Sequence, residues 1–148
     1  MGWWSTSPLG GDEPLDALSE LEDLLKVNEL YPLEAIDDVT RKKVKRNWKW
    51  SKIANWLCGK SDNNGMYHIS PVNAQVVVCL GMACGIKFTD FHKSEFIKLI
   101  DEDPWGQQDK ERKLSMDALK EALLNYENGV PTFIDNPGVL ETMLSNID

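Results

Sequence analysis

The sequence predicts an all-α, or nearly all-α, single domain over residues 1–148, with five or six helices around a buried helix at residues 71–85. Three observations support this. The stretch 70–85, SPVNAQVVVCLGMACG, is apolar on every face of a helix, which is typical of a core element. The segments on both sides of it carry amphipathic helical spacing. A chain of 148 residues with 42% hydrophobic residues has the size and composition of one globular domain.

The chain opens with an arm over residues 1–12 that contains Trp3, Trp4 and a Ser-Pro and Gly-Gly sequence, which favours an ordered loop over a helix. Two interpretations of the tryptophans remain open. The rings pack against the body of the protein, or they bind a partner, because Trp is enriched at interface hot spots. We favour packing, since two adjacent exposed indoles promote aggregation.

The residues of this arm resemble the opening of a family of small phage and bacterial proteins that contain a domain of unknown function. The shared pattern is Met-Gly-Trp-Trp-Ser followed by Gly-Gly-Asp-x-Pro-Leu-Asp, and it covers residues 1–18. The matching positions here are Met1, Gly2, Trp3, Trp4, Ser5, Gly10, Gly11, Asp12, Pro14, Leu15 and Asp16. A weaker resemblance over residues 103–131 rests on Asp103, Trp105, Arg112, Tyr126, Gly129 and Pro131. The resemblance implies a phage or prophage setting and implies no activity.

Two helices are expected before the central one. Asp12 is a suitable cap for a helix over residues 13–27, whose leucines form one apolar stripe: Leu15, Leu18, Leu21, Leu24 and Leu25. A single long helix is expected over residues 32–57, with an inward stripe of Leu33, Ile36, Val39, Trp50, Ile53 and Leu57. Residues 58–69 form a loop with a turn signal at Asn64-Gly65.

The central helix has clear ends. Ser70 is a good N-cap, Pro71 suits the first helical position, and Gly85 can adopt the left-handed conformation that ends a helix. The three consecutive valines also fit a buried strand, but the caps and the length favour a helix. About 15 residues span only about 22 Å, too short to cross a bilayer core of about 30 Å.

Three further helices are expected after it. Thr89 or Asp90 caps a helix that ends near residue 100, and a long helix follows over residues 107–126. Residues 133–134 are a short extended piece. A last short helix is indicated by Val139, Leu140, Met143 and Leu144.

Charge is distributed very unevenly along the chain. The net charge is −8, but residues 1–38 carry −9, residues 39–60 carry +8 with no acidic residue, and residues 61–148 carry −7. Such segregation bears on electric fields and partners and says little about fold.

The basic block 41–52, RKKVKRNWKWSK, is the strongest functional signal. On one continuous helix, Lys42, Lys45, Arg46 and Lys49 share one side. Three interpretations remain open: a solvated face paired with the chain's own acids in residues 20–38, a surface for a host or self protein, or a nucleic-acid-binding surface. We expect Trp48 and Trp50 to be core or boundary residues. The candidate partner-binding residues are Arg41, Lys42, Lys45, Arg46, Lys49, Trp3 and Trp4.

Other patterns give no catalytic, metal or cofactor site. Loop 58–69 departs from a calcium loop, and we favour a solvated loop over a cation site for the acidic run 101–103. Cys79 and Cys84 lie in the apolar helix without zinc-ligand spacing, and a Cys58–His68 nucleophile pair is the remaining route to a hydrolase. The chain lacks a phosphate loop, a nucleophile elbow and an HExxH motif, so we predict no enzyme and no cofactor.

The sequence therefore predicts a non-catalytic protein-interaction module, in the phage setting an inhibitor of a host defence or nucleic-acid-handling protein. The alternative is a nucleic-acid-binding module that uses the basic helix 41–52. Three cysteines, an odd number, and the absence of a basic-then-apolar run at the start predict a cytoplasmic protein without membrane attachment.

Overall fold

Helices account for all the regular structure in the computed structural model, which describes residues 8–58 and 70–133. Within these ranges lie seven α-helices, a short 3-10 helix and no strand. In chain order the elements are α1 (Asp12–Leu25), η1 (Leu33–Ala35), α2 (Asp38–Asn47), α3 (Trp50–Cys58), α4 (Pro71–Cys84), α5 (Asp90–Asp101), α6 (Pro104–Gln108) and α7 (Lys110–Asn125). The predicted all-α class is confirmed. The expected count of five or six helices is too low, because two predicted helices are each divided.

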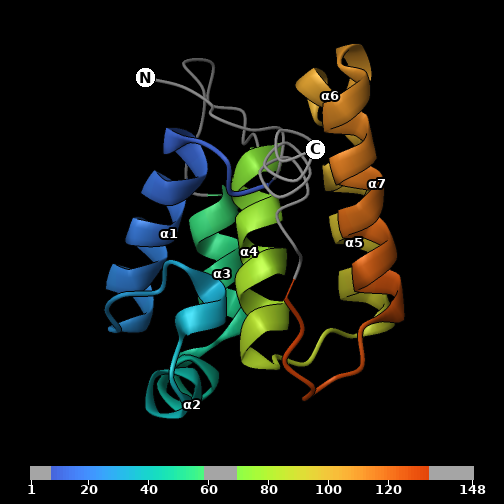
Figure 1. Cartoon of the computed structure of the whole chain (residues 1–148). Coiled ribbons are helices and arrows are strands. Elements are labelled where there is room, and N and C mark those ends of the chain that lie inside the picture. The colour runs from blue at the N-terminus through green and yellow to red at the C-terminus, as the bar shows by residue number, and fades with distance from the viewer. Residues whose placement is uncertain (1–7, 59–69, 134–148) are drawn as a thin grey trace, which may run out of the picture.

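Helix α4 occupies the centre of the molecule, as predicted (Figure 1). Every residue from 73 to 84 is buried, so this helix has no solvent-facing stripe. The ends are those expected from the sequence: the Ser70 hydroxyl accepts a hydrogen bond from the Asn73 backbone N–H, and Gly85 adopts φ = +74°. A positive φ is readily accessible to glycine, which explains why the helix ends there.

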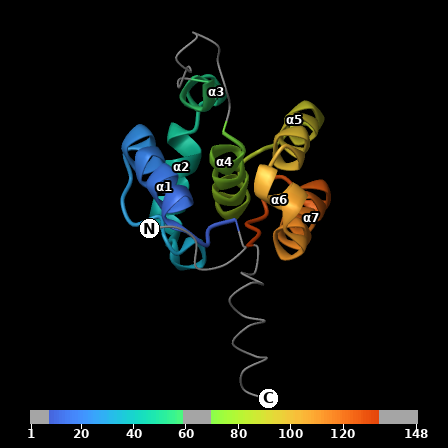
Figure 2. The same ribbon diagram turned by 90° about the horizontal axis from the view of Figure 1, so that it is seen from above.

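The other helices form two groups on either side of α4. Seen along the α4 axis, α1, α2 and α3 lie on one side, and α5, α6 and α7 lie on the other (Figure 2). One hydrophobic core runs through both groups and includes Leu18 and Leu21 from α1, Ile100 from α5 and Leu119 from α7. The chain order therefore places its first and second halves on opposite flanks of one buried helix.

The prediction of a single helix over residues 32–57 is wrong. The structure has η1, then α2, then a break at Trp48-Lys49, then α3. Val44 and Trp48 are buried, and so is Ile53 after the break. At about 100° per residue, a continuous helix would point Ile53 about 180° away from Val44, so one core could not cover both. The break turns the chain so that both residues face the core.

The expected inward stripe of this region is correct only in part. Leu33, Ile36, Ile53 and Leu57 are buried, whereas Val39 is 64% exposed. Val39 lies in the first turn of α2, and Val44 takes the inward position on that helix instead. At the first helix, Gly11 precedes α1 and Asp12 is its first residue, so Asp12 is not the cap.

The second half follows the expected order with one division. The capping residue Thr89 precedes α5, and its hydroxyl accepts a hydrogen bond from the His92 backbone N–H at 3.1 Å. The helix expected over residues 107–126 is interrupted by Asp109, which has an extended backbone and separates α6 from α7. The Asp109 carboxylate accepts a hydrogen bond from the Arg112 backbone N–H at 3.0 Å, so it caps α7.

A buried polar network joins α7 to α4 and to the start of α6. Arg112 is fully buried and donates from Nε to Asp103 Oδ2 and from Nη2 to Gln75 Oε1, each at 2.8 Å. The guanidinium also lies 4.7 Å from the Trp105 ring centroid. The expectation of a solvated acidic run at residues 101–103 is correct for Asp101 and Glu102, which are exposed, and wrong for Asp103, which is only 4% exposed.

Several predicted features lie outside the described residues. They are the tryptophans of the arm, the Asn64-Gly65 turn, His68 and the last helix near residues 139–144. Of the arm, the structure describes residues 8–12, in which Gly10 and Gly11 are buried. None of the described helices combines the length and apolar character that a bilayer-crossing segment requires.

Candidate functional site

Helix α2 presents most of the basic block to solvent. The Asp37 side chain accepts a hydrogen bond from the Thr40 backbone N–H at 2.7 Å and so caps the helix. This hydrogen bond lowers the pKa of the Asp37 carboxyl, with smaller contributions from Lys43 and Arg41. Val44 is the buried residue of the helix and fixes its orientation on the core. Lys42, Lys43, Lys45 and Arg46 are thereby turned outward, whereas Arg41 is half-buried.

We define the basic face as Lys42, Lys45 and Arg46. All three are exposed. Within residues 8–58 and 70–133 they form no ion pair. Lys45 and Arg46 also lie in the last turn of α2, where the helix dipole favours positive charge. The basic face is therefore a local concentration of positive charge on a chain whose net charge is −8.

Neutralisation of the block by the chain's own acids is limited in the described part of the chain. Arg41 pairs with Asp38 at 2.6 Å and donates to the Ile36 backbone carbonyl at 3.3 Å. Glu22, one of the acids in residues 20–38 that could pair with the basic block, instead accepts a hydrogen bond from the Leu30 backbone N–H. Of the predicted partner-binding residues, Arg41 thus has a local structural partner, while the basic face has no ion-pair partner among the residues that the structure describes.

Lys49 does not belong to the same helix as the basic face. It lies at the joint between α2 and α3 and is exposed, and its backbone carbonyl accepts from the Ile53 N–H. The helical spacing that grouped it with Lys45 therefore does not apply across the joint. Trp3 and Trp4, the other predicted partner-binding residues, are outside the described residues.

The tryptophans of the block pack within the protein, as expected. Trp48 is 7% exposed, and its ring contacts that of Trp50 at a centroid distance of 5.4 Å. Trp50 in turn lies 4.1 Å from the His92 ring and 5.3 Å from the Phe88 ring. Neither indole is an unoccupied platform on which a nucleic-acid base could stack.

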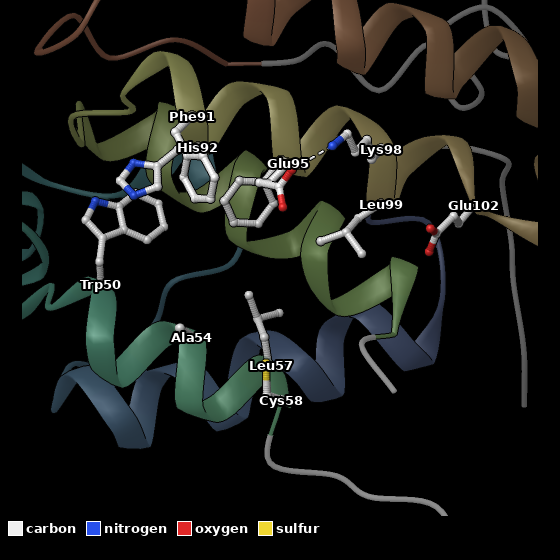
Figure 3. Close-up of a pocket in the computed structure, with 11 residues that line it drawn as sticks. Trp50, Ala54, Leu57, Cys58, Phe91, His92, Glu95, Lys98, Leu99 and Glu102 are labelled. Atoms are coloured by element: carbon white, nitrogen blue, oxygen red, sulfur yellow. Dashed lines mark hydrogen bonds and ion pairs between the residues drawn. The ribbon is translucent and has the colours of Figure 1, made fainter. Parts of the chain in front are cut away.

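A groove of about 370 Å³ lies between α3 and α5 (Figure 3). The α3 wall is uncharged and consists of Trp50, Ala54, Leu57 and Cys58. The α5 wall combines apolar and charged side chains: Phe91, His92, Glu95, Phe96, Lys98, Leu99 and Glu102. The groove could not be predicted from the sequence, because it depends on α3 and α5, which are far apart in the chain and lie on either side of α4, having facing walls. The apolar residue Phe91 on an otherwise polar helix face was the available signal.

The carboxylates and cysteines of the described residues are the remaining candidates for metal binding or nucleophilic chemistry. No group of three His, Cys, Asp or Glu residues within them is arranged to hold a metal ion. Asp101 pairs with Lys120 and Asp103 with Arg112, so these carboxylates serve the fold. Burial raises the pKa of Cys79 to about 12 and that of Cys84 to about 11, which disfavours the nucleophilic thiolate. The proposed partner of Cys58, His68, lies outside the described residues.

Comparison with known proteins leaves the site to be interpreted from its own geometry. No protein-family model matches the chain, and neither the curated proteins nor the solved structures contain a match.

Proposed function

We propose that this protein is a non-catalytic protein-interaction module whose basic face on α2 binds an acidic surface of a partner protein. The observation that carries the proposal is that Lys42, Lys45 and Arg46 are exposed and form no ion pair with the described residues. Complementary charges of this kind speed encounter and orient partners more than they add raw affinity.

The surroundings of the basic face support a protein partner over a single-stranded nucleic acid. Stacking on aromatic rings supplies much of the affinity for unpaired bases. The two tryptophans nearest the basic face, Trp48 and Trp50, are packed against other rings. Helix α2 has ten residues and extends about 15 Å, and the chain as a whole is acidic, which opposes approach to a long polyanion.

A phage setting and a cytoplasmic location are part of this proposal. The resemblance of residues 1–18 to phage and bacterial proteins supports a role in which the module blocks a host protein, such as one that acts in defence or handles nucleic acid. The cysteines Cys58, Cys79 and Cys84 are all free thiols, which supports a reducing compartment.

The test is affinity capture from the native host with three forms of the full chain. One is unchanged, one carries Lys45→Glu and Arg46→Glu on the basic face, and one carries Lys87→Glu and Lys110→Glu elsewhere. Lys87 and Lys110 are exposed, so both variants change the net charge by the same amount at solvent-facing positions. We expect an acidic protein to be captured by the unchanged chain and by the Lys87/Lys110 variant, and lost from the Lys45/Arg46 variant.

Two outcomes would reject the proposal. The first is identical capture by all three forms, which would mean that the basic face is a solvated surface. The second is capture that disappears after nuclease treatment and weakens steeply between about 50 and about 200 mM salt, which is the behaviour of nucleic-acid binding.

A further inference from the structure

The groove between α3 and α5 has a shape that could accommodate one more helix. The α3 wall uses positions 50, 54, 57 and 58, and the α5 wall uses 91, 92, 95, 96, 98 and 99 together with 102, which follows the helix. These positions recur every three or four residues, so each helix turns one complete stripe toward the groove. In Figure 3 the two stripes face each other along the groove, from Trp50 and His92 at one end to Cys58 and Glu102 at the other.

The centre of the groove is widened by a small residue. Ala54 lies midway along the α3 wall and is exposed, and no large side chain from α3 fills the space between Trp50 and Leu57. Across the groove, Phe91 leaves 70% of its surface exposed although it borders an apolar lining. A ridge of apolar side chains from another helix would fill this space and cover the Phe91 ring.

A helix suits the groove better than an extended chain or a small ligand. The backbone groups of α3 and α5 are already paired within their helices, so an extended peptide would bring its N–H and C=O groups into an apolar groove without partners. A helix satisfies its own backbone. Pockets for small molecules usually have a few convergent polar groups, whereas here Glu95, Lys98 and Glu102 lie on one wall only.

The charges on the α5 wall favour a positively charged occupant. Glu95 is paired with Lys98 at 3.0 Å, and Glu102 forms no ion pair with the residues that the structure describes. The α3 wall carries no charge, so the lining has an excess of negative charge. Lysine or arginine side chains flanking the apolar stripe of an incoming helix would meet Glu95 and Glu102.

We propose that the α3–α5 groove binds an amphipathic helix of a partner protein, with an apolar stripe seated over Ala54 beside Phe91 and basic residues facing Glu95 and Glu102. The α3 wall, from residue 50 to residue 58, spans about 12 Å, so the contact extends over two to three turns. This surface is separate from the basic face on α2, and the inference does not depend on the function proposed for that face.

The test uses three synthetic peptides of about 14 residues, each about 21 Å long as a helix. The first has a leucine stripe flanked by lysines, the second replaces the lysines with glutamates, and the third has the composition of the first in an order that forms no stripe. Binding to the full chain is measured by titration calorimetry. We expect the first peptide to bind at least tenfold more tightly than either of the others.

Variants of the chain locate the binding. Ala54→Trp fills the groove, and Phe91→Ala removes the exposed ring at its edge. Each variant should lower the affinity for the first peptide at least tenfold. Asn55→Trp places the same indole at the next residue of α3, outside the groove lining, and should leave affinity unchanged. Because Ala54, Asn55 and Phe91 are exposed, these substitutions are expected to fold, which circular dichroism verifies. The Lys45→Glu and Arg46→Glu variant should bind as the unchanged chain does.

Several results would overturn the inference. They are equal binding of the third peptide, which would indicate attraction by charge alone; tighter binding of the glutamate peptide; affinity that survives Ala54→Trp; and no binding of any of the three peptides at millimolar concentration. Loss of binding in the Lys45 and Arg46 variant would assign the peptide to the basic face and would also reject the groove.

Discussion

Removal of the Arg112 charge is expected to be among the most damaging single changes in the described core. Arg112→Met leaves Asp103, which is 4% exposed, without its guanidinium partner, and it leaves the Gln75 side-chain oxygen without the donor at 2.8 Å. Breaking a buried ion pair from one side costs about 3–5 kcal/mol, because the remaining charge is uncompensated. The free energy of unfolding of a small domain is about 5–15 kcal/mol, so this loss would be a large share of the total stability.

The measurement is urea unfolding followed by circular dichroism, with the free energy of unfolding extrapolated to water. The control is Lys113→Met on the same helix, because Lys113 pairs with Asp117 at 3.2 Å while its side chain is 66% exposed. An exposed pair contributes about 0–1 kcal/mol, so the control should lose little. A chain with Arg112→Met that fails to fold in buffer meets the prediction only if the control folds normally.

A double variant tests the cause. Asp103→Asn keeps an acceptor for the Gly106 backbone N–H, which lies 3.1 Å from Asp103 Oδ2, and removes the buried charge. In combination with Arg112→Met it should be more stable than Arg112→Met alone. The reasoning would be refuted if Arg112→Met cost no more than Lys113→Met, or if the added Asp103→Asn change lowered stability further.

Three further results are expected. Gly81→Ala should lower the free energy of unfolding in urea by about 1–3 kcal/mol, because the added Cβ would lie 2.7 Å from the Phe88 ring. Adding Phe88→Leu should recover part of that loss. A Gly81→Ala chain as stable as the unchanged one would contradict the packing described. Burial lowers the pKa of His92, so the stability that neutral His92 contributes is present above the unfolded pKa of about 6.5 and is lost as pH falls through the lower folded pKa. The free energy of unfolding should therefore drop less across this pH interval in His92→Gln than in the unchanged chain. Identical pH profiles for the two chains would contradict this prediction. Burial raises the pKa of Cys79 to about 12 and of Cys84 to about 11, so both thiols should react with a disulfide reagent only when the chain is unfolded, and rapid labelling of the native protein at either position would disprove this.

Local sequence determined the elements whose ends are encoded by their own residues. Helix α4 begins after Ser70 and ends before Gly85 because a hydroxyl cap and a glycine act within one turn of the helix. Thr89 marks the start of α5 in the same way. Continuous apolar character from Val76 to Leu80 was enough to predict burial on every side, since such a stretch cannot face water on any stripe.

Tertiary packing decided the features that depend on residues distant in the chain. The break at Trp48-Lys49 has neither glycine nor proline to mark it, and it exists because Val44 and Ile53 must face the same core. On a continuous helix the two residues would point about 180° apart, and the conflict becomes visible only once both are known to be buried. Likewise, Asp103 belongs to an acidic run in the sequence, and only the position of Arg112 on α7 makes it a buried ion-pair partner.

The candidate surfaces divide along the same line. The sequence by itself determined that a cationic segment exists, because charge pattern is local, and it indicated which side of α2 would carry Lys42, Lys45 and Arg46. The structure decided that Arg41 has a partner in Asp38, that Lys49 leaves the helix, and that α3 and α5 enclose a groove. The physical reason is that caps and charge act over a few residues, whereas burial, ion pairing across the core and grooves between helices arise only when distant segments pack around α4.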